Sequence, residues 1–82
     1  MKIVLLGIGK TGSLVREVAI ERGHTVEVLL ESENDKAAGL TKQRLARIDV
    51  VIDFTTPHCV LDNIRACLEC GMNMVVGTTG WY

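Results

Sequence analysis

Three glycines stand close together near the start of the chain, at positions 7, 9 and 12. Glycine lets the backbone turn tightly and approach another molecule with no side chain in the way. The pattern G-x-G-x-x-G, placed between a strand and a helix, is typical of loops that hold the pyrophosphate of a dinucleotide. Backbone N–H groups and the positive end of the helix then face the phosphates.

The residues on either side of these glycines predict that context. Residues 3–6 are apolar throughout and too few for a helix, which indicates a buried parallel strand. Helical periodicity follows over about residues 10–22, and Gly23 is a natural stop for that helix. The expected apolar face of the helix carries Leu14, Val15, Val18 and Ala19. The first candidate cofactor-binding residues are therefore Gly7, Ile8, Gly9, Lys10, Thr11 and Gly12.

An acidic residue supports the dinucleotide interpretation. Dinucleotide-binding units place an acidic residue about twenty positions after the glycines, at the end of the second strand, to bind the ribose hydroxyls. Residues 26–30 are the expected second strand, and Glu31 follows them directly. A 2′-phosphate about 4 Å from this carboxylate would meet repulsion of about 1 kcal/mol in water and about 4 kcal/mol at an effective dielectric of 20. Ser32 stands where an NADP-selective site would favour arginine, so the sequence predicts NADH as the preferred cofactor, with NADPH tolerated.

Two other interpretations of residues 7–12, which we call the glycine segment, fit less well. The glycines alone would suit a simple strand-to-helix turn, with Glu31 a solvated loop residue, but an acid at that position favours nucleotide binding. Residues Gly9-Lys10-Thr11 also imitate the end of a P-loop. That motif requires a glycine five residues before the Gly-Lys pair, where this chain has Val4.

Composition bounds the function classes. Eighty-two residues form at most one small domain, and with 48% hydrophobic and three aromatic residues its core must be aliphatic. The formal charge of −1 gives no reason to expect nucleic acid or a membrane surface as a partner. The sequence has no apolar run of the ~20 residues that span a bilayer. A strand begins directly after Met1-Lys2, so we expect no signal peptide and a cytoplasmic location.

Cysteine and histidine add no predicted chemistry. Cys59, Cys67 and Cys70 are an odd set that suggests reduced thiols. The Cys67-x-x-Cys70 spacing resembles a redox or zinc pair, but no second pair or neighbouring histidine completes four ligands. We therefore expect no metal and assign His24 and His58 no chemical role.

The remaining elements follow in order. Residues 31–39 are polar and aperiodic and predict a loop, and Thr41 can cap a short helix to about residue 47. Leu40 and Leu45 have the spacing of a hydrophobic staple around that cap. Residues 49–54 predict a third strand and residues 72–76 a fourth. Between them a helix begins at Pro57 with Thr56 as its N-cap and ends at Gly71, with a buried face of Val60, Ile64, Cys67 and Leu68.

This alternation predicts an α/β, Rossmann-like fold: a parallel four-stranded sheet with helices on both faces. Eighteen residues separate strands two and three, enough for one crossover, so we place strand three beside strand one in the order 2-1-3-4. The order 3-2-1-4 is the alternative. In the first order, residues 54–57 and 77–80 meet the glycine segment at the carboxyl edge. Their hydroxyl and N–H groups suit a carboxamide or a carboxylate, unless Thr56 and Thr78 only cap helices and turn the chain.

Three segments together resemble the N-terminal domain of the 4-hydroxy-tetrahydrodipicolinate reductase family: Gly-Ile-Gly-Lys-Thr-Gly, Asp-Val-Val-Ile-Asp-Phe-Thr-Thr-Pro and Val-Val-Gly-Thr-Thr-Gly-Trp-Tyr. That family reduces a cyclic precursor of diaminopimelate and lysine with NADH or NADPH. The resemblance implies that Lys10 lies near the adenosine ribose. It also implies that the nicotinamide is lined by Phe54, Thr55, Thr56, Gly77, Thr78 and Thr79, the last three also near the substrate.

The resemblance also implies what the chain does not contain. In the family, the substrate-binding histidine and lysine residues lie in a C-terminal domain that builds the tetramer. We therefore expect residues 1–82 to be a truncated dinucleotide-binding domain without catalytic residues, inactive alone. The alternatives are half of another small dehydrogenase, acting on aspartate or homoserine, or a stand-alone nucleotide-binding module. No expected helix covers the fourth strand before Trp81, which predicts a homo-oligomer.

Overall fold

Four parallel strands form a single sheet in the computed structural model, which describes residues 1–7 and 9–77 without the side chain of Glu31. The strands are β1 (Lys2–Leu6), β2 (Thr25–Leu29), β3 (Val50–Asp53) and β4 (Met74–Val76), and their spatial order is β2-β1-β3-β4. The helices are α1 (Gly9–Glu21), α2 (Lys42–Leu45) and α3 (Pro57–Glu69). The predicted order 2-1-3-4 is confirmed, and the alternative 3-2-1-4 is wrong.

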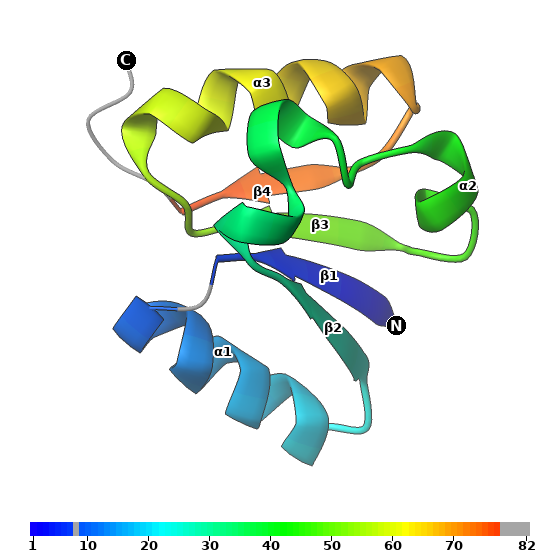
Figure 1. Ribbon diagram of the computed structural model, residues 1–82. Coiled ribbons are helices and arrows are strands. Elements are labelled where there is room, and N and C mark those ends of the chain that lie inside the picture. The colour runs from blue at the N-terminus through cyan, green and yellow to red at the C-terminus, as the bar shows by residue number, and fades with distance from the viewer. Residues whose placement is uncertain (8, 78–82) are drawn as a thin grey trace.

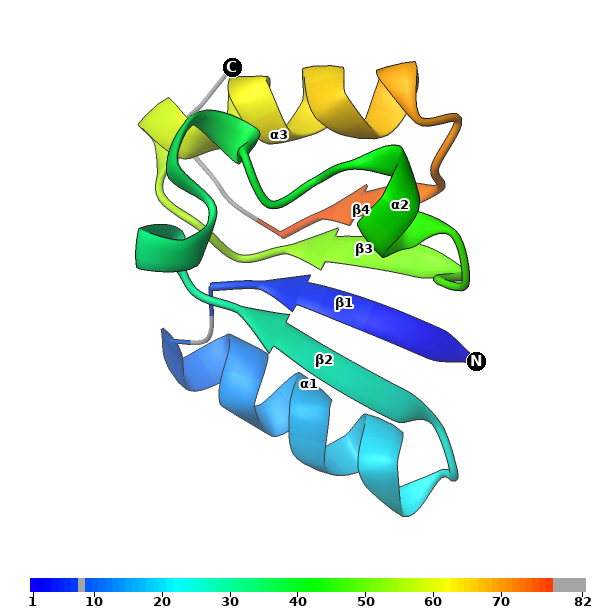
Figure 2. The ribbon, with the colours of Figure 1, turned by 45° about the vertical axis from the view of Figure 1, so that its right-hand side comes forward.

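The helices cover the two faces of the sheet unequally. Figures 1 and 2 show α1 on one side of the sheet, and α2 and α3 on the other. Successive β1 residues point to opposite faces, so that Ile3 and Leu5 pack with Ala19 of α1, whereas Val4 and Leu6 pack under α2 and α3. Both faces of the central strand are therefore buried, as expected for a parallel sheet.

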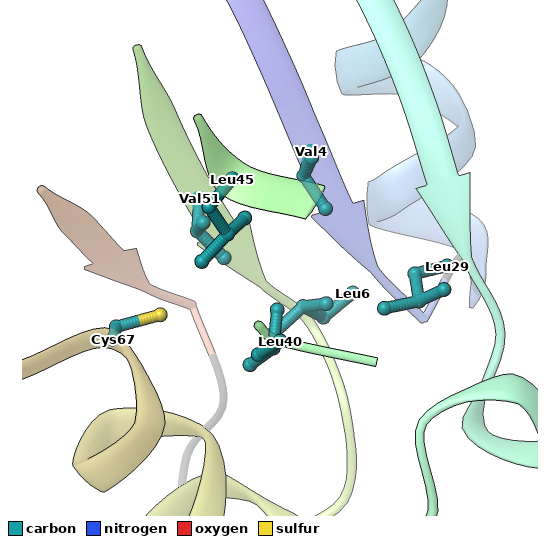
Figure 3. Close-up of a cluster of buried hydrophobic side chains, with 7 residues drawn as sticks. All are labelled: Val4, Leu6, Leu29, Leu40, Leu45, Val51 and Cys67. Atoms are coloured by element: carbon teal, nitrogen blue, oxygen red, sulfur yellow. The ribbon is translucent and has the colours of Figure 1, made fainter. Parts of the chain in front are cut away.

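The core on the α3 side is aliphatic, as the composition predicts. Figure 3 shows its buried side chains: Val4, Leu6, Leu29, Leu40, Leu45, Val51 and Cys67. The predicted capping of α2 is confirmed, because Thr41 Oγ1 accepts a hydrogen bond from the Arg44 backbone N–H at 3.1 Å. Leu40 and Leu45, on either side of this cap, are both 5% exposed. The staple thus fixes the short helix on the core.

The two long helices end as the sequence predicts. Gly23 and Gly71 follow α1 and α3 with positive φ angles of 85° and 66°. Beyond each glycine the backbone N–H donates back into the helix, from His24 to the Ala19 carbonyl at 3.0 Å and from Met72 to the Cys67 carbonyl at 2.8 Å. These bonds satisfy carbonyl groups that the helix itself leaves unpaired.

Two helix faces differ from the prediction. Leu14 and Val18 of α1 are 61% and 48% exposed, because the sheet contacts a narrower stripe of this helix that includes Gly12 and Ala19. On α3, Leu68 is 73% exposed. The buried residues of that helix are Val60, Asn63 and Cys67.

The segment between β2 and α2 also differs from the predicted loop. It forms two turns of 3-10 helix, η1 (Glu31–Glu33) and η2 (Asp35–Ala37). Such short turns need only i→i+3 hydrogen bonds and no apolar periodicity, so the polar sequence carried no signal for them. None of the helices in the described ranges is long and apolar enough to cross a membrane.

Candidate functional site

Three loops leave the sheet at the same level, because hydrogen bonds align the carboxyl ends of the strands. The Gly7 N–H donates to the Leu29 carbonyl at 3.0 Å, and the Phe54 N–H donates to the Leu6 carbonyl at 2.9 Å. On the other side of β3, the Gly77 N–H donates to the Asp53 carbonyl at 2.8 Å. The segments after β1, β3 and β4 are therefore neighbours at one edge, where ligands of such sheets bind.

These segments line an open cleft of about 380 Å³. Eight of the predicted site residues line it together with Pro57: Gly9, Lys10, Thr11, Gly12, Phe54, Thr55, Thr56 and Gly77. The predicted meeting of the glycine segment with residues 54–57 is thus confirmed. Predicted residues Ile8, Thr78 and Thr79 lie outside the described part of the chain.

Gly7 directly follows β1, and its position disfavours a side chain for two reasons. Its φ of +71° is one that other residues rarely adopt, and a Cβ there would lie 3.1 Å from the Phe54 carbonyl oxygen. The first glycine of the motif therefore brings the glycine segment into contact with the backbone of the loop after β3.

The first turn of α1 opens into the cleft. Gly9 is its first residue, and Lys10 and Thr11 are exposed beside it. The N–H groups of a first turn have no partner inside the helix, and here no acidic side chain occupies that turn. Lys10 adds a positive charge. This corner of the cleft therefore favours an anionic group such as a pyrophosphate.

Thr55 is held on the wall of the cleft by Asp53, a carboxyl group that is fully buried at the end of β3. The Thr55 backbone N–H and hydroxyl both donate to Asp53 Oδ1, at 2.7 and 2.6 Å. The hydroxyl proton of Thr55 is thereby committed to the protein. In this arrangement the Thr55 hydroxyl does not donate a hydrogen bond to a ligand carboxylate or phosphate.

Thr56 precedes α3 as predicted, but its side chain does not act as predicted. It has the extended backbone of an N-cap, with Pro57 next in the helix, yet its hydroxyl makes no capping hydrogen bond. Instead the hydroxyl oxygen lies 3.4 Å from Cys59 Sγ and 3.3 Å from His58 Nε2. The fixed φ of Pro57 starts the helix without a side-chain cap.

The predicted ribose-binding residue, Glu31, follows β2 as the first residue of η1, and its side chain lies outside what the structure describes. A second cavity, of about 500 Å³, lies between this segment and the start of α3. Its lining includes Ser32, Asn34, Lys36, Thr55 and Asn63. Thr55 therefore borders both cavities, and Asn34 and Asn63 are residues near the site that the sequence analysis missed.

The cysteines are all free thiols. Burial above all, together with the neighbouring Cys70 and Asp53, raises the pKa of Cys67 to about 11. A thiol with such a pKa stays protonated at neutral pH and is a poor nucleophile and a poor metal ligand. Within residues 1–7 and 9–77, no three His, Cys, Asp or Glu side chains gather as a metal site.

Comparison with known proteins gives the family. A family model described as dihydrodipicolinate reductase, N-terminus, matches residues 1–82. The chain is 35% identical to the 4-hydroxy-tetrahydrodipicolinate reductase of Christiangramia forsetii over 83 residues, which cover 99% of this chain and 32% of that protein. It is 35% identical to the reductase of the same name from Natronomonas pharaonis over 88 residues, covering 99% of this chain and 36% of the relative.

A third relative carries the same name. The 4-hydroxy-tetrahydrodipicolinate reductase of Corynebacterium diphtheriae is 31% identical over 78 residues, which cover 95% of this chain and 26% of that protein. The chain thus spans about a third of the length of the curated relatives it matches. The match through all of its residues shows that the chain belongs to the dihydrodipicolinate reductase N-terminal family.

Proposed function

We propose that this chain is the NAD(P)H-binding part of a reductase that transfers hydride to the cyclic precursor of diaminopimelate and lysine. The observation that carries the proposal is the 380 Å³ cleft, which joins the glycine segment, residues 54–57 and Gly77 at one edge of the sheet. The family match favours this function over an aspartate or homoserine dehydrogenase and over a stand-alone nucleotide-binding module.

Each wall of the cleft suits one part of the cofactor. The first turn of α1, with Lys10, suits the pyrophosphate, and Glu31 at the end of β2 suits the adenosine ribose. Phe54, Thr55 and Thr56 would then lie beside the nicotinamide. Gly77, Thr78 and Thr79 would complete that side and also contact the substrate.

NADH is the cofactor that we expect to bind more tightly. The carboxylate of Glu31 would accept hydrogen bonds from the 2′- and 3′-hydroxyl groups but would repel a 2′-phosphate. Lys10 in the cleft and Lys36 in the neighbouring cavity offset part of that repulsion. The result is a preference for NADH with NADPH still accepted.

Turnover needs more than this chain supplies. Hydride transfer requires the nicotinamide and the acceptor to be held at about 3–3.5 Å. In the longer reductases of this family, we expect the groups that hold the substrate to lie in the part that the chain does not match, a C-terminal domain that also builds the oligomer. Residues 1–82 alone would bind the cofactor, in the cytoplasm, without appreciable catalysis.

Self-association is part of the same proposal. Val75 of β4 is 56% exposed, and it pairs with Ile52 on the face of the sheet where α1 packs over β1 and β2. An uncovered apolar sheet face at the edge strand favours contact with a second copy. Sedimentation at increasing concentration should show dimers or larger species, and a clean monomer at high concentration would contradict this.

The test of cofactor binding is a titration with NADH and NADPH, read by quenching of Trp81, the only tryptophan. We expect saturable quenching with tighter binding of NADH. Glu31→Ala should weaken NADH binding and reduce the difference in affinity between the two cofactors. Glu21→Ala, an exposed acid at the far end of α1, is the matched control and should change neither affinity. A folded chain that binds neither cofactor would refute the proposed function.

A further inference from the structure

A continuous line of hydrogen-bonded side chains runs beneath the candidate site. Asn34 Nδ2 donates to Asn63 Oδ1 at 2.8 Å, and Asn63 Nδ2 donates to Asp53 Oδ2 at 3.0 Å. The other carboxylate oxygen of Asp53 accepts from the N–H and hydroxyl of Thr55. We call this line, Asn34–Asn63–Asp53–Thr55, the amide relay.

The amide relay lies inside the protein. Asp53, Asn63 and Asn34 are 0%, 1% and 8% exposed. Polar groups so buried are costly unless every partner is in place, and a network that is satisfied fixes one arrangement of the groups it joins. Asn63 lies on the inner stripe of α3 between Val60 and Cys67, where an apolar residue would serve packing alone. The side-chain amide of Asn63 therefore serves to connect Asn34 with Asp53.

At one end, the relay holds the segment between β2 and α2. Asn34 Oδ1 accepts from the Gly39 N–H at 2.9 Å, and the Asn34 carbonyl accepts from the Ala37 N–H at 3.0 Å. Lys36 and Ala37 between them have φ angles of +51° and +64°. Residues other than glycine adopt such angles only where the surroundings impose them. The anchoring of Asn34 therefore sets the shape of the segment that begins with Glu31.

At the other end, the relay fixes the wall of the cleft. The Thr55 methyl group lies 3.4 Å from the position that a Cβ on Gly7 would take, so Thr55 packs against the glycine segment. Thr55 also lines both the 380 Å³ cleft and the 500 Å³ cavity beside η1. The relay thus ties the two proposed halves of the cofactor site to one buried carboxylate.

We propose that Asn63 is a positioning residue that sets the distance between the adenosine-binding segment after β2 and the nicotinamide-binding loop after β3. The inference rests on the proposed function. A dinucleotide must contact both segments at once. An error in their spacing therefore weakens the binding of the whole ligand, although no group that touches the ligand has changed. Asn34 acts on the cofactor through Asn63 in the same way.

A double-mutant cycle tests this coupling. NADH dissociation constants are measured for the unaltered 82-residue chain, for Asn34→Ala, for Asn63→Ala and for the double variant. We expect about tenfold weaker binding for Asn63→Ala and about fivefold for Asn34→Ala, as for the loss of a buried hydrogen bond. If the relay couples the two residues, the double variant binds within about twofold of Asn63→Ala. Effects that multiply would overturn the inference.

The control separates positioning from stability. Cys67→Ala removes a buried side chain from the same helix, one turn beyond Asn63 and outside the relay. It should lower the free energy of unfolding and leave the NADH affinity of the folded chain unchanged. If Cys67→Ala weakens NADH as much as Asn63→Ala does, the effect is general destabilisation and the proposal fails.

A second measurement covers an Asn63→Ala variant that does not fold. Reduced nicotinamide mononucleotide lacks the adenosine half and does not reach the segment after β2. Asn34→Ala should nevertheless weaken it about threefold, because the relay transmits the change to Thr55. Unchanged binding would refute the relay. Failure of the unaltered, folded chain to bind NADH would instead refute the proposed function, so the two failures are distinguishable.

Discussion

The ring of Phe54 packs directly against Gly77, so that a Cβ on that glycine would overlap the ring carbons Cδ1 and Cε1. The two residues follow neighbouring strands, β3 and β4, and both line the cleft. The absence of a side chain at position 77 is therefore what lets an aromatic ring close this side of the site.

We expect Gly77→Ala to displace the Phe54 ring and to weaken NADH binding about tenfold or more, because the ring must leave its place in the cleft wall to make room for the Cβ. Isothermal calorimetry or Trp81 quenching measures the effect. The matched control is Gly71→Ala, whose Cβ would meet no atom within 4 Å. Its positive φ should cost about 1 kcal/mol of stability and leave the affinity unchanged. Equal affinities for the two variants would contradict the steric role of Gly77.

Gly7 and Gly23 allow a second comparison of two glycines, which differ in the space available to a side chain. Both have positive φ, but only at Gly7 would a Cβ approach a neighbouring atom, the Phe54 carbonyl oxygen at 3.1 Å. We expect Gly23→Ala to lower the free energy of unfolding by about 1 kcal/mol and Gly7→Ala by about 2–3 kcal/mol. Urea denaturation of both variants measures the difference. A loss at Gly7 no greater than at Gly23 would mean that the strands can separate there without cost.

Asp53 should tolerate even an isosteric change poorly. An amide at this position would turn its NH₂ group toward either the donors of Thr55 or the NH₂ of Asn63, so donor would face donor. We expect Asp53→Asn to cost about 2 kcal/mol of stability. Asp49→Asn is the control, since Asp49 Oδ2 accepts only at the exposed end of the sheet, from the Lys2 N–H at 2.7 Å. It should change the stability by less than about 0.5 kcal/mol.

The Cys67 thiol should make the fold sensitive to alkali. Its pKa rises from 9.0 to about 11 in the folded chain, mainly through burial. Below about pH 9 the thiol is protonated in both states and the stability is complete. Between about pH 9 and 11 it ionises only in the unfolded chain, so the stability should fall by about 2 kcal/mol. Unfolding curves over this range should show the fall, and Cys67→Ala should lack that part of it.

The same burial sets the order of thiol labelling. Cys59 and Cys70 are partly exposed, whereas Cys67 is 1% exposed. Iodoacetamide at neutral pH should therefore modify Cys59 and Cys70 in the folded chain and Cys67 only after urea is added. Peptide mass mapping reads the result. Early modification of Cys67 would show that the α3 side of the core opens readily.

Local sequence was enough for the four strands and three helices of this fold and for most of the residues that line its cleft. Apolar runs located the four strands, Gly23 and Gly71 located the helix ends, and the short crossover predicted the order 2-1-3-4. Each of these signals is carried by neighbours in the chain, through backbone sterics or periodicity. The meeting of the glycine segment with Phe54 and Thr55 then followed from the topology, because parallel strands bring their carboxyl ends to one edge.

What the sequence did not reveal depends on contacts between distant elements. The exposure of Leu14 and Leu68 follows from how narrow a stripe of each helix meets the sheet. The burial of Asn63 follows from a carboxylate on β3 and an amide after β2, which only folding brings together. Sequence alone therefore determined the strands, the helix ends and the glycine segment after β1. Tertiary structure decided which polar side chains enter the core, because a buried amide is stable only where a distant partner is present to satisfy it.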